Sequence, residues 1–223
     1  MKDDLKLFNL RIQDKLKDFC WVSDKNKLVF FVIPKNASTS IRNTTLFKNC
    51  SNRTTFEDVE YKIKNENYST FAVLREPVER FISAYHEVVR GHREDNPYDT
   101  ARDKQFIKFD EEPKRFNLFL KEIESSGFFD SHLKPQMHFL TDANNEQIEI
   151  KNYLFFNNIV EDFYTFSSSI GSPIILPDRN SYLKKGKKNL LDYVLNDKKS
   201  LDFINKFYKD DIIFYNEKSN LIK

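Results

Sequence analysis

Short apolar runs alternate with amphipathic stretches along the chain, and the second half is mostly helical. Three of the runs have the length and the β-forming residues of buried parallel strands; they cover residues 28–33, 70–74 and 153–156. Apolar residues at helical spacing follow each run and predict helices over residues 38–47, 77–90 and 159–168. Strands that alternate with helices predict an α/β fold, in which a central parallel sheet is flanked by helices.

The rest of the pattern adds helices and one segment without a clear periodicity. Helices are predicted over residues 114–125 and 198–208, and residues 1–19 have the spacing of an amphipathic N-terminal helix. Residues 91–114 are polar and charged throughout, and we interpret them as a surface excursion. No repeat or linker interrupts the chain, so we expect one domain over residues 1–223.

Composition narrows the class of protein. The 36 basic and 34 acidic side chains give a net charge of +2, which is not the profile of a nucleic-acid-binding protein. No apolar run approaches the ~18 residues of a membrane span, and the charged N-terminus is not a signal peptide. We therefore expect a soluble cytoplasmic protein, or a lumenal one only if a membrane anchor has been removed. The sequence leaves the oligomeric state open.

The first candidate site is the segment FFVIPKNASTSIRN, where an apolar run ends in a lysine and a hydroxyl-rich turn. Lys35 supplies a positive charge, and the residues after it can turn successive backbone N–H groups towards an anion. None of the four glycines precedes Lys35, so the segment is neither a Walker A loop nor a G-x-G-x-x-G fingerprint. The alternative is an ordinary surface lysine followed by Ser38 as a plain helix N-cap.

The second candidate site follows the next strand, in the segment FAVLREPVERFISAY. Arg75 stands at the strand end, Pro77 suits the first position of a helix, and Ser83 falls off the apolar stripe of that helix. A planar guanidinium with a nearby hydroxyl suits a phosphate monoester. The alternative is that Arg75 simply pairs with Glu79.

Two anion sites at one edge of a parallel sheet suit a nucleotide with phosphates at both its 5′ and 3′ positions. The segments IPKNASTS and REPVERFISAY resemble the two phosphate motifs of sulfotransferases that use 3′-phosphoadenosine 5′-phosphosulfate (PAPS). The version is similar to the membrane-type carbohydrate sulfotransferases, including uronyl 2-O-sulfotransferases and their bacterial relatives. The resemblance runs over residues 20–216 and includes HLKPQMHFL, NYLFFNNIVEDF and SPIILPDRNS.

The resemblance implies a three-layer, P-loop-like fold and a role for each motif residue. Lys35 contacts the 5′-phosphate and the oxygen that bridges to sulfur, and the residues that line this phosphate are Asn36, Ala37, Ser38, Thr39 and Ser40. Arg75 and Ser83 hold the 3′-phosphate. The segment NSYLKKGKKN resembles a basic loop over the cofactor, and its implied contacts are Ser181, Lys184 and Lys185. The alternative for that segment is a solvated basic turn.

The implied reaction is in-line transfer of a sulfuryl group to a hydroxyl, which we expect to belong to a carbohydrate. The attacking hydroxyl needs a general base, yet no histidine lies between residues 35 and 75, where some relatives have one. His132 is our first candidate, and the alternative for it is a purely structural hydrogen-bonding role. His86 is the second candidate, and an acid such as Glu57 or Glu60 the third. No metal ligands are apparent, so we expect no metal cofactor. The alternatives are a nucleotide-binding protein without catalysis and a phosphotransferase.

Overall fold

The computed structural model describes residues 20–48, 50, 56–90, 112–126, 130–142, 146–176 and 185–221. The predicted N-terminal helix and most of the polar excursion lie outside this part. The chain divides into two compact units. One, which we call the sheet unit, comprises Met1–Leu74 and Gln136–Asp178; the other, the helical unit, comprises Arg75–Pro135 and Arg179–Lys223. The single domain expected over residues 1–223 stays a prediction.

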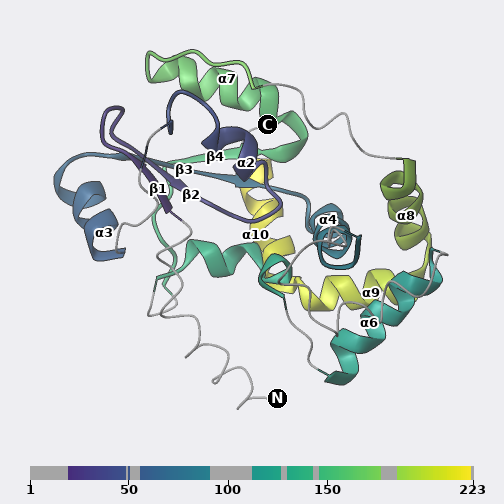
Figure 1. Cartoon of the computed structure of the whole chain (residues 1–223). Helices are drawn as coiled ribbons and strands as arrows, with labels where there is room; N and C mark the ends of the chain where they lie inside the picture. Colours follow the sequence, from purple (N-terminus) through teal and green to yellow (C-terminus); the bar gives the residue numbers. More distant parts are fainter. Residues whose placement is uncertain are drawn as a thin grey trace, which may run out of the picture. The chain divides into compact units, whose positions relative to one another are not determined.

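The sheet unit is built on four strands in the order β1-β2-β3-β4 (Figure 1). Their bounds are Cys20–Ser23, Leu28–Phe31, Ser69–Leu74 and Asn152–Phe155. β2, β3 and β4 run parallel, and β1 pairs antiparallel with β2. The three predicted strands and the α/β class are thus confirmed, while the antiparallel β1 makes the sheet mixed rather than purely parallel.

The described helices of the sheet unit cover its apolar residues. They are α2 (Ser38–Arg42), α3 (Phe56–Asn65) and α7 (Ile159–Ser169), with short 3-10 turns η3 (Gln136–Leu140) and η4 (Phe156–Asn158). Phe30 of β2 stacks on Phe71 of β3 with ring centroids 4.7 Å apart, and Phe166 of α7 packs on Phe71 at 4.6 Å. Aromatic contacts of this kind add to the burial of apolar surface, and they fix α7 against the sheet.

The helix predicted over residues 38–47 is wrong in extent, because α2 ends at Arg42 and a series of turns follows. The hydroxyl of Thr44 donates to the backbone carbonyl of Ile41 at 2.7 Å, and the Thr44 N–H donates to the same carbonyl. Threonine side chains that bond the nearby backbone in this way compete with helix hydrogen bonds. The chain therefore leaves the helix after one turn.

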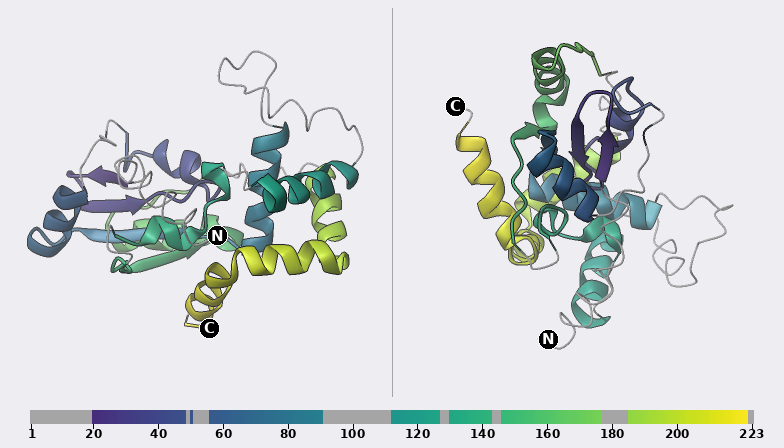
Figure 2. Two further views of the ribbon diagram at one scale, coloured as in Figure 1. Left: turned by 90° about the horizontal axis from the view of Figure 1, so that it is seen from below. Right: turned by 90° about the vertical axis from the view of Figure 1, so that its left-hand side faces the viewer.

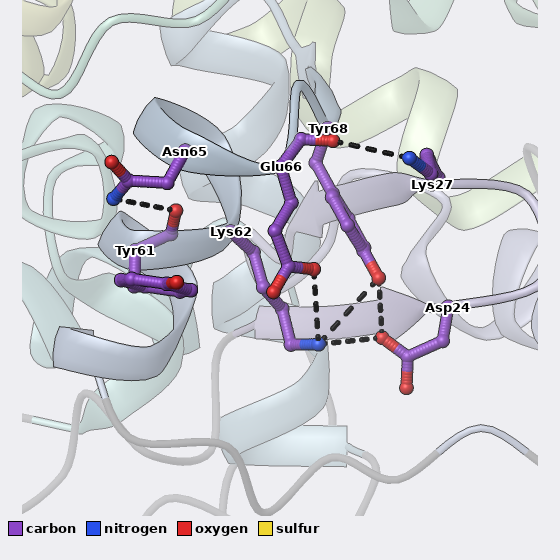
Figure 3. Close-up of polar contacts among 7 residues, drawn as sticks. All are labelled: Asp24, Lys27, Tyr61, Lys62, Asn65, Glu66 and Tyr68. Atoms are coloured by element: carbon purple, nitrogen blue, oxygen red, sulfur yellow. Dashed lines mark hydrogen bonds and ion pairs between the residues drawn. The ribbon is translucent and has the colours of Figure 1, made fainter.

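α3 was not predicted from the sequence, and a polar cluster ties it to the turn after β1 (Figure 3). Lys62 of α3 donates to Asp24 at 2.8 Å, and the hydroxyl of Tyr68 donates to the same carboxylate at 2.7 Å. The bond from Lys62, followed by that from Tyr68, lowers the pKa of Asp24 below its ordinary value. The Asp24 side chain is 72% exposed, so we expect its ion pair with Lys62 to add little to stability.

The helical unit contains α4, α6, α8, α9 and α10, together with the 3-10 turn η2. Their bounds are Pro77–Arg90, Lys114–Ser126, Lys185–Asn196, Lys198–Phe207, Lys209–Asn220 and Ser131–Leu133. α4 contacts η2, α8, α9 and α10, and Figure 2 shows α9 and α10 as consecutive yellow helices that meet at an angle. Phe81 of α4 is fully buried and makes edge-to-face contacts with several rings of its core, namely Phe116, Phe119, Phe203, Phe207 and Tyr208.

The predicted helices of the helical unit are confirmed to within one residue at their ends, whereas α8 and α10 were missed. The apolar stripe of α4 is also confirmed, since all of its described members are buried. They are Val78, Phe81, Ile82, Tyr85 and Val88. In the part of the chain that the structure describes, no helix combines the length and the apolar character that a membrane span requires.

Candidate active site

The loop between β2 and α2 takes left-handed backbone conformations without any glycine. Lys35 has a φ of 72° and Ala37 a φ of 59°. Such conformations cost a residue with a Cβ about 1–3 kcal/mol each, and they persist only where the surrounding structure imposes them. Two of them within three residues make this loop a candidate functional site.

Asn36, between those two residues, is the anchor that imposes the loop's shape. Its side chain is fully buried, and its amide nitrogen donates to the backbone carbonyl of Val73 at 2.7 Å and to Oε1 of Gln136 at 2.6 Å. Buried hydrogen bonds of this kind are costly to break, because they leave a polar group without a partner. Asn36 therefore ties the loop to β3 and η3, and its side chain points into the protein.

The start of α2 differs from that of an ordinary capped helix. Ala37 is the N-cap and offers no side-chain oxygen to the first turn, so Ser38 is the first helical residue rather than the cap. Lys35, Ser38 and Ser40 are partly exposed and Thr39 is exposed. The plain N-cap alternative for Ser38 is therefore wrong. The hydroxyl groups of this turn lie at the surface beside the strained backbone.

Arg75 follows β3 directly and is only 7% exposed. Its Nε lies 3.7 Å from Oε2 of Glu79, which is an ion pair longer than a good hydrogen bond. Burial lowers the pKa of Arg75 to about 10, against the opposing charge of Glu79, and the guanidinium stays protonated at neutral pH. The pairing with Glu79 that the sequence left as an alternative is present in the structure.

The beginning of α4 is occupied by the carboxylate of Glu76, a feature that sequence reasoning missed. Its two oxygens accept from the backbone N–H of Val78 at 3.1 Å and of Glu79 at 2.7 Å. Burial raises the pKa of Glu76, although these two bonds oppose the shift. These two N–H groups are therefore already bonded. An anion near Arg75 would have to bind side chains instead. Ser83 on α4 is buried, at 5% exposed.

His132 lies in η2 of the helical unit and is held by a carboxylate. Its Nδ1 is 2.7 Å from Oδ1 of Asp130, and the same oxygen accepts from the backbone N–H of His132 at 2.7 Å. The imidazole side chain remains 37% exposed. Asp130 caps η2. It was not predicted from the sequence, where the only signal for it is its position two residues before a candidate histidine.

A family model described as the sulfotransferase family matches residues 18–216. The chain belongs to the sulfotransferase family. The match includes the loop at Lys35, the segment from Arg75 to Ser83 and the turn at His132, so it spans both compact units. Comparisons with curated proteins and with solved structures found no match. Membership supports sulfuryl transfer as the class of reaction, and the four-stranded sheet with its helices is consistent with the fold of a sulfotransferase.

The other candidate bases of this sulfotransferase have different surroundings. His86 lies on α4, is only 7% exposed and packs on Tyr85 with ring centroids 5.3 Å apart. Glu60 of α3 forms an ion pair with Lys64. The side chain of Glu57 lies outside the described residues. The side chain of His132 is partly exposed and its ring contacts a carboxylate, so His132 stays our first candidate for the general base.

The predicted basic loop falls almost wholly outside the described part. Ser181 and Lys184 lie outside it, and Lys185 begins α8 with a side chain that is not described. Their role in this sulfotransferase stays a prediction. Among the residues that the structure describes, no group of three or more His, Cys, Asp or Glu side chains is placed to hold a metal ion.

Proposed function

We propose that this sulfotransferase uses PAPS as the donor and transfers its sulfuryl group to a hydroxyl of a carbohydrate. The observation that carries the proposal is the glycine-free loop after β2, whose backbone is held in left-handed conformations beside Lys35. β2 and β3 are adjacent parallel strands, and β3 leads directly into Arg75. Two cation-bearing segments thus follow neighbouring strands, as a cofactor with a phosphate at each end requires.

The loop after β2 would bind the 5′-phosphosulfate. Lys35 would contact the 5′-phosphate and the bridging oxygen, and the turn at Ser38, Thr39 and Ser40 would supply N–H and hydroxyl donors. Ala37 would contribute through its backbone. The buried side chain of Asn36 supports a positioning role, because its hydrogen bonds to Val73 and Gln136 hold the loop to the rest of the sheet unit.

The junction after β3 would bind the 3′-phosphate. Arg75 offers a planar guanidinium that can bond two phosphate oxygens at once, and Ser83 adds a hydroxyl about two turns into α4. The carboxylate of Glu79 now neutralises part of the charge of Arg75. A phosphate that binds here would compete with that pairing.

The transfer itself is an in-line displacement. The acceptor hydroxyl loses its proton to Nε2 of His132, its oxygen bonds to sulfur, and the bond from sulfur to the phosphate oxygen breaks. Negative charge grows on the leaving oxygen, where the ammonium of Lys35 stabilises the transition state more than the ground state. A contact of this kind contributes about 3–4 kcal/mol, by comparison with the loss of one oxyanion-hole donor.

The acceptor is proposed from the resemblance of the two phosphate motifs to those of carbohydrate sulfotransferases. Sulfuryl transfer requires a nucleophile, and a sugar hydroxyl supplies one whose proton a histidine can remove. The partly exposed imidazole of His132 is consistent with an acceptor that approaches from solvent. Transfer from PAPS to a panel of mono- and oligosaccharides would test this part of the proposal.

The donor is tested by calorimetric titration with 3′-phosphoadenosine 5′-phosphate (PAP), the product left after transfer, alongside AMP and Mg-ATP. We expect PAP to bind with a Kd of about 1 μM, which corresponds to about −8 kcal/mol, and AMP to bind at least ~10-fold more weakly. Equal and weak binding of all three ligands would contradict the proposal. Tight binding of Mg-ATP alone would favour a phosphotransferase.

A further inference from the structure

The candidate base His132 is held at its ring and at its backbone, by residues that come from different parts of the helical unit. Asp130 contacts the ring nitrogen Nδ1, as described above. Arg80 of α4 donates from Nη2 to the backbone carbonyl of His132 at 3.2 Å. His132 is thus held at its ring by Asp130 and at its backbone carbonyl by Arg80.

Tyr208, at the junction of α9 and α10, completes this support. Nη1 of Arg80 donates to the Tyr208 hydroxyl at 3.0 Å, and that hydroxyl donates to the carbonyl of Leu133 at 2.7 Å. The guanidinium also lies over the tyrosine ring, 5.5 Å from its centroid. One planar side chain therefore connects α4, the turn η2 and the start of α10.

Burial of a charged guanidinium has a free-energy cost that an apolar side chain in the same place would not have. Arg80 and Tyr208 are both fully buried, and a buried charged group is destabilising unless well-placed hydrogen bonds and charges compensate for the lost water. Apolar side chains of similar volume would hold three helices together equally well. A buried guanidinium does offer two donors in a fixed plane, which sets the positions of two acceptors at once.

The tyrosine hydroxyl keeps its proton under all ordinary conditions. Burial raises the pKa of Tyr208 to about 12, and the charge of Arg80 only partly opposes the shift. The hydroxyl therefore always donates to Leu133 and always accepts from Arg80. The support has one stable pattern of hydrogen bonds and does not switch near neutral pH.

The contact with Asp130 has a chemical consequence for the imidazole. A carboxylate accepts hydrogen bonds and cannot donate them when ionised, so the neutral imidazole must carry its proton on Nδ1. The lone pair then lies on Nε2, at the opposite side of the ring. A side chain that is 37% exposed can offer this nitrogen to an acceptor hydroxyl.

We propose that Asp130, Arg80 and Tyr208 are positioning residues that hold His132 as the general base, with Asp130 fixing its tautomer and the Arg80–Tyr208 pair fixing its backbone. This inference rests on the proposed function. Arg80 lies on the same helix as Ser83, so α4 carries both a proposed contact to the 3′-phosphate and the support of the base. Cofactor recognition and proton removal thus share one rigid element.

The tautomer is tested by ¹⁵N NMR of the His132 imidazole at pH 8, where an ordinary histidine is neutral. We expect the wild type to carry its proton on Nδ1, and Asp130→Asn to lose this preference, because an amide can donate as well as accept. Asp197→Asn is the matched control, since Asp197 caps α9 in the same unit without contacting a histidine. A proton on Nε2 in the wild type, or an unchanged tautomer in Asp130→Asn, would overturn the inference.

The backbone support is tested by hydrogen exchange of the His132 amide, which donates to Asp130. In Tyr208→Phe we expect this amide to exchange about 10-fold faster, which corresponds to about 1.4 kcal/mol. Tyr85→Phe is the matched control: Tyr85 is also fully buried, and its hydroxyl donates to Glu112 at 2.7 Å instead. Equal exchange in Tyr208→Phe and the wild type, or an equal effect of Tyr85→Phe, would contradict the backbone role.

Turnover separates this inference from the proposed function. If the wild type transfers sulfate, we expect Asp130→Asn to lower kcat by about 10–100-fold, as the loss of an orienting partner does elsewhere, with the Kd for PAP changed less than about 2-fold. Unchanged kcat would refute the positioning role alone. A wild type that neither binds PAP nor transfers sulfate would refute the proposed function, whatever the NMR result.

Discussion

The two proposed phosphate sites are built differently. In the loop after β2, the backbone is strained and is held by the neutral side chain of Asn36. At the junction after β3, the helix is regular and several charged side chains lie close together. Lys35 and Ala37 are held at positive φ by the amide of Asn36. Arg75 instead stands before a well-capped helix, with Glu76 and Glu79 beside it. The first region is preorganised by backbone geometry, and the second by a balance of charge.

The difference suits the two ends of the proposed cofactor. At the 5′ end, charge changes during the reaction, and a rigid cradle stabilises the transition state without reorganising. At the 3′ end, the phosphate is only recognised, so an arginine that exchanges one anionic partner for another is sufficient. We therefore expect changes in the first region to affect turnover most, and changes in the second to affect affinity.

The largest effect is expected for Lys35→Met. Loss of the charge beside the leaving oxygen should lower turnover by about 10²–10³-fold, while the Kd for PAP rises by less than about 10-fold. Transfer from PAPS and calorimetry with PAP measure the two quantities. Lys25→Met, at an exposed lysine in the turn after β1, is the matched control. An equal loss of turnover and affinity would mean that Lys35 binds the ground state and the transition state alike.

Arg75→Met should weaken PAP binding by about 10–100-fold, as expected for a lost charged hydrogen-bonding group. The affinity for AMP should not change, because AMP has no 3′-phosphate. Arg75→Lys keeps the charge but lacks the planar guanidinium, so its affinity for PAP should lie between those of the wild type and Arg75→Met. Calorimetry with both nucleotides decides the matter, after a thermal melt has verified that each variant folds. Equal weakening of PAP and AMP would remove Arg75 from the 3′ site.

Glu79→Gln should tighten PAP binding by about 3–10-fold, because removal of a carboxylate near Arg75 leaves more positive charge for the phosphate. The gain should shrink as salt is added, since part of this site is exposed. Glu124→Gln, at an exposed acid of α6, controls for the change in net charge. Weaker PAP binding in Glu79→Gln would show that Glu79 orients Arg75 rather than competing for it.

The smallest effect is expected for Ala37→Gly. Glycine adopts positive φ without a Cβ penalty, so the substitution should raise the free energy of unfolding by about 0.5–1 kcal/mol. The freer loop should weaken PAP binding by about 2-fold. Ala84→Gly, inside α4, should destabilise by about 1 kcal/mol. Denaturant unfolding measures both variants, and destabilisation by Ala37→Gly would argue against strain at this position.

The sequence predicted the parallel strands and the helices after β3 and β4 because each follows from a local apolar pattern. Short motifs also indicated Lys35, Arg75 and His132 as site residues, and their roles stay predictions. It missed β1, which is four residues long and pairs antiparallel, and it extended α2 because the Thr44 hydroxyl bond that ends this helix leaves no periodic trace. Periodicity does not record such individual hydrogen bonds.

The contacts that organise the site were also beyond the sequence, since they join residues far apart in the chain. Asn36 reaches Gln136, and Arg80 reaches Tyr208. No spacing in the sequence relates the members of these pairs. Asp130 lies only two residues before His132, but it was not predicted either.

The most direct test of the account is a crystal structure of the chain with PAP bound. We expect a single PAP molecule whose 5′-phosphate contacts Lys35 and the turn at Ser38, and whose 3′-phosphate contacts Arg75 and Ser83. In that complex Arg75 should have turned from Glu79 to the phosphate. PAP bound at only one of the two regions, or away from both, would contradict the claim that they form the two ends of one cofactor site.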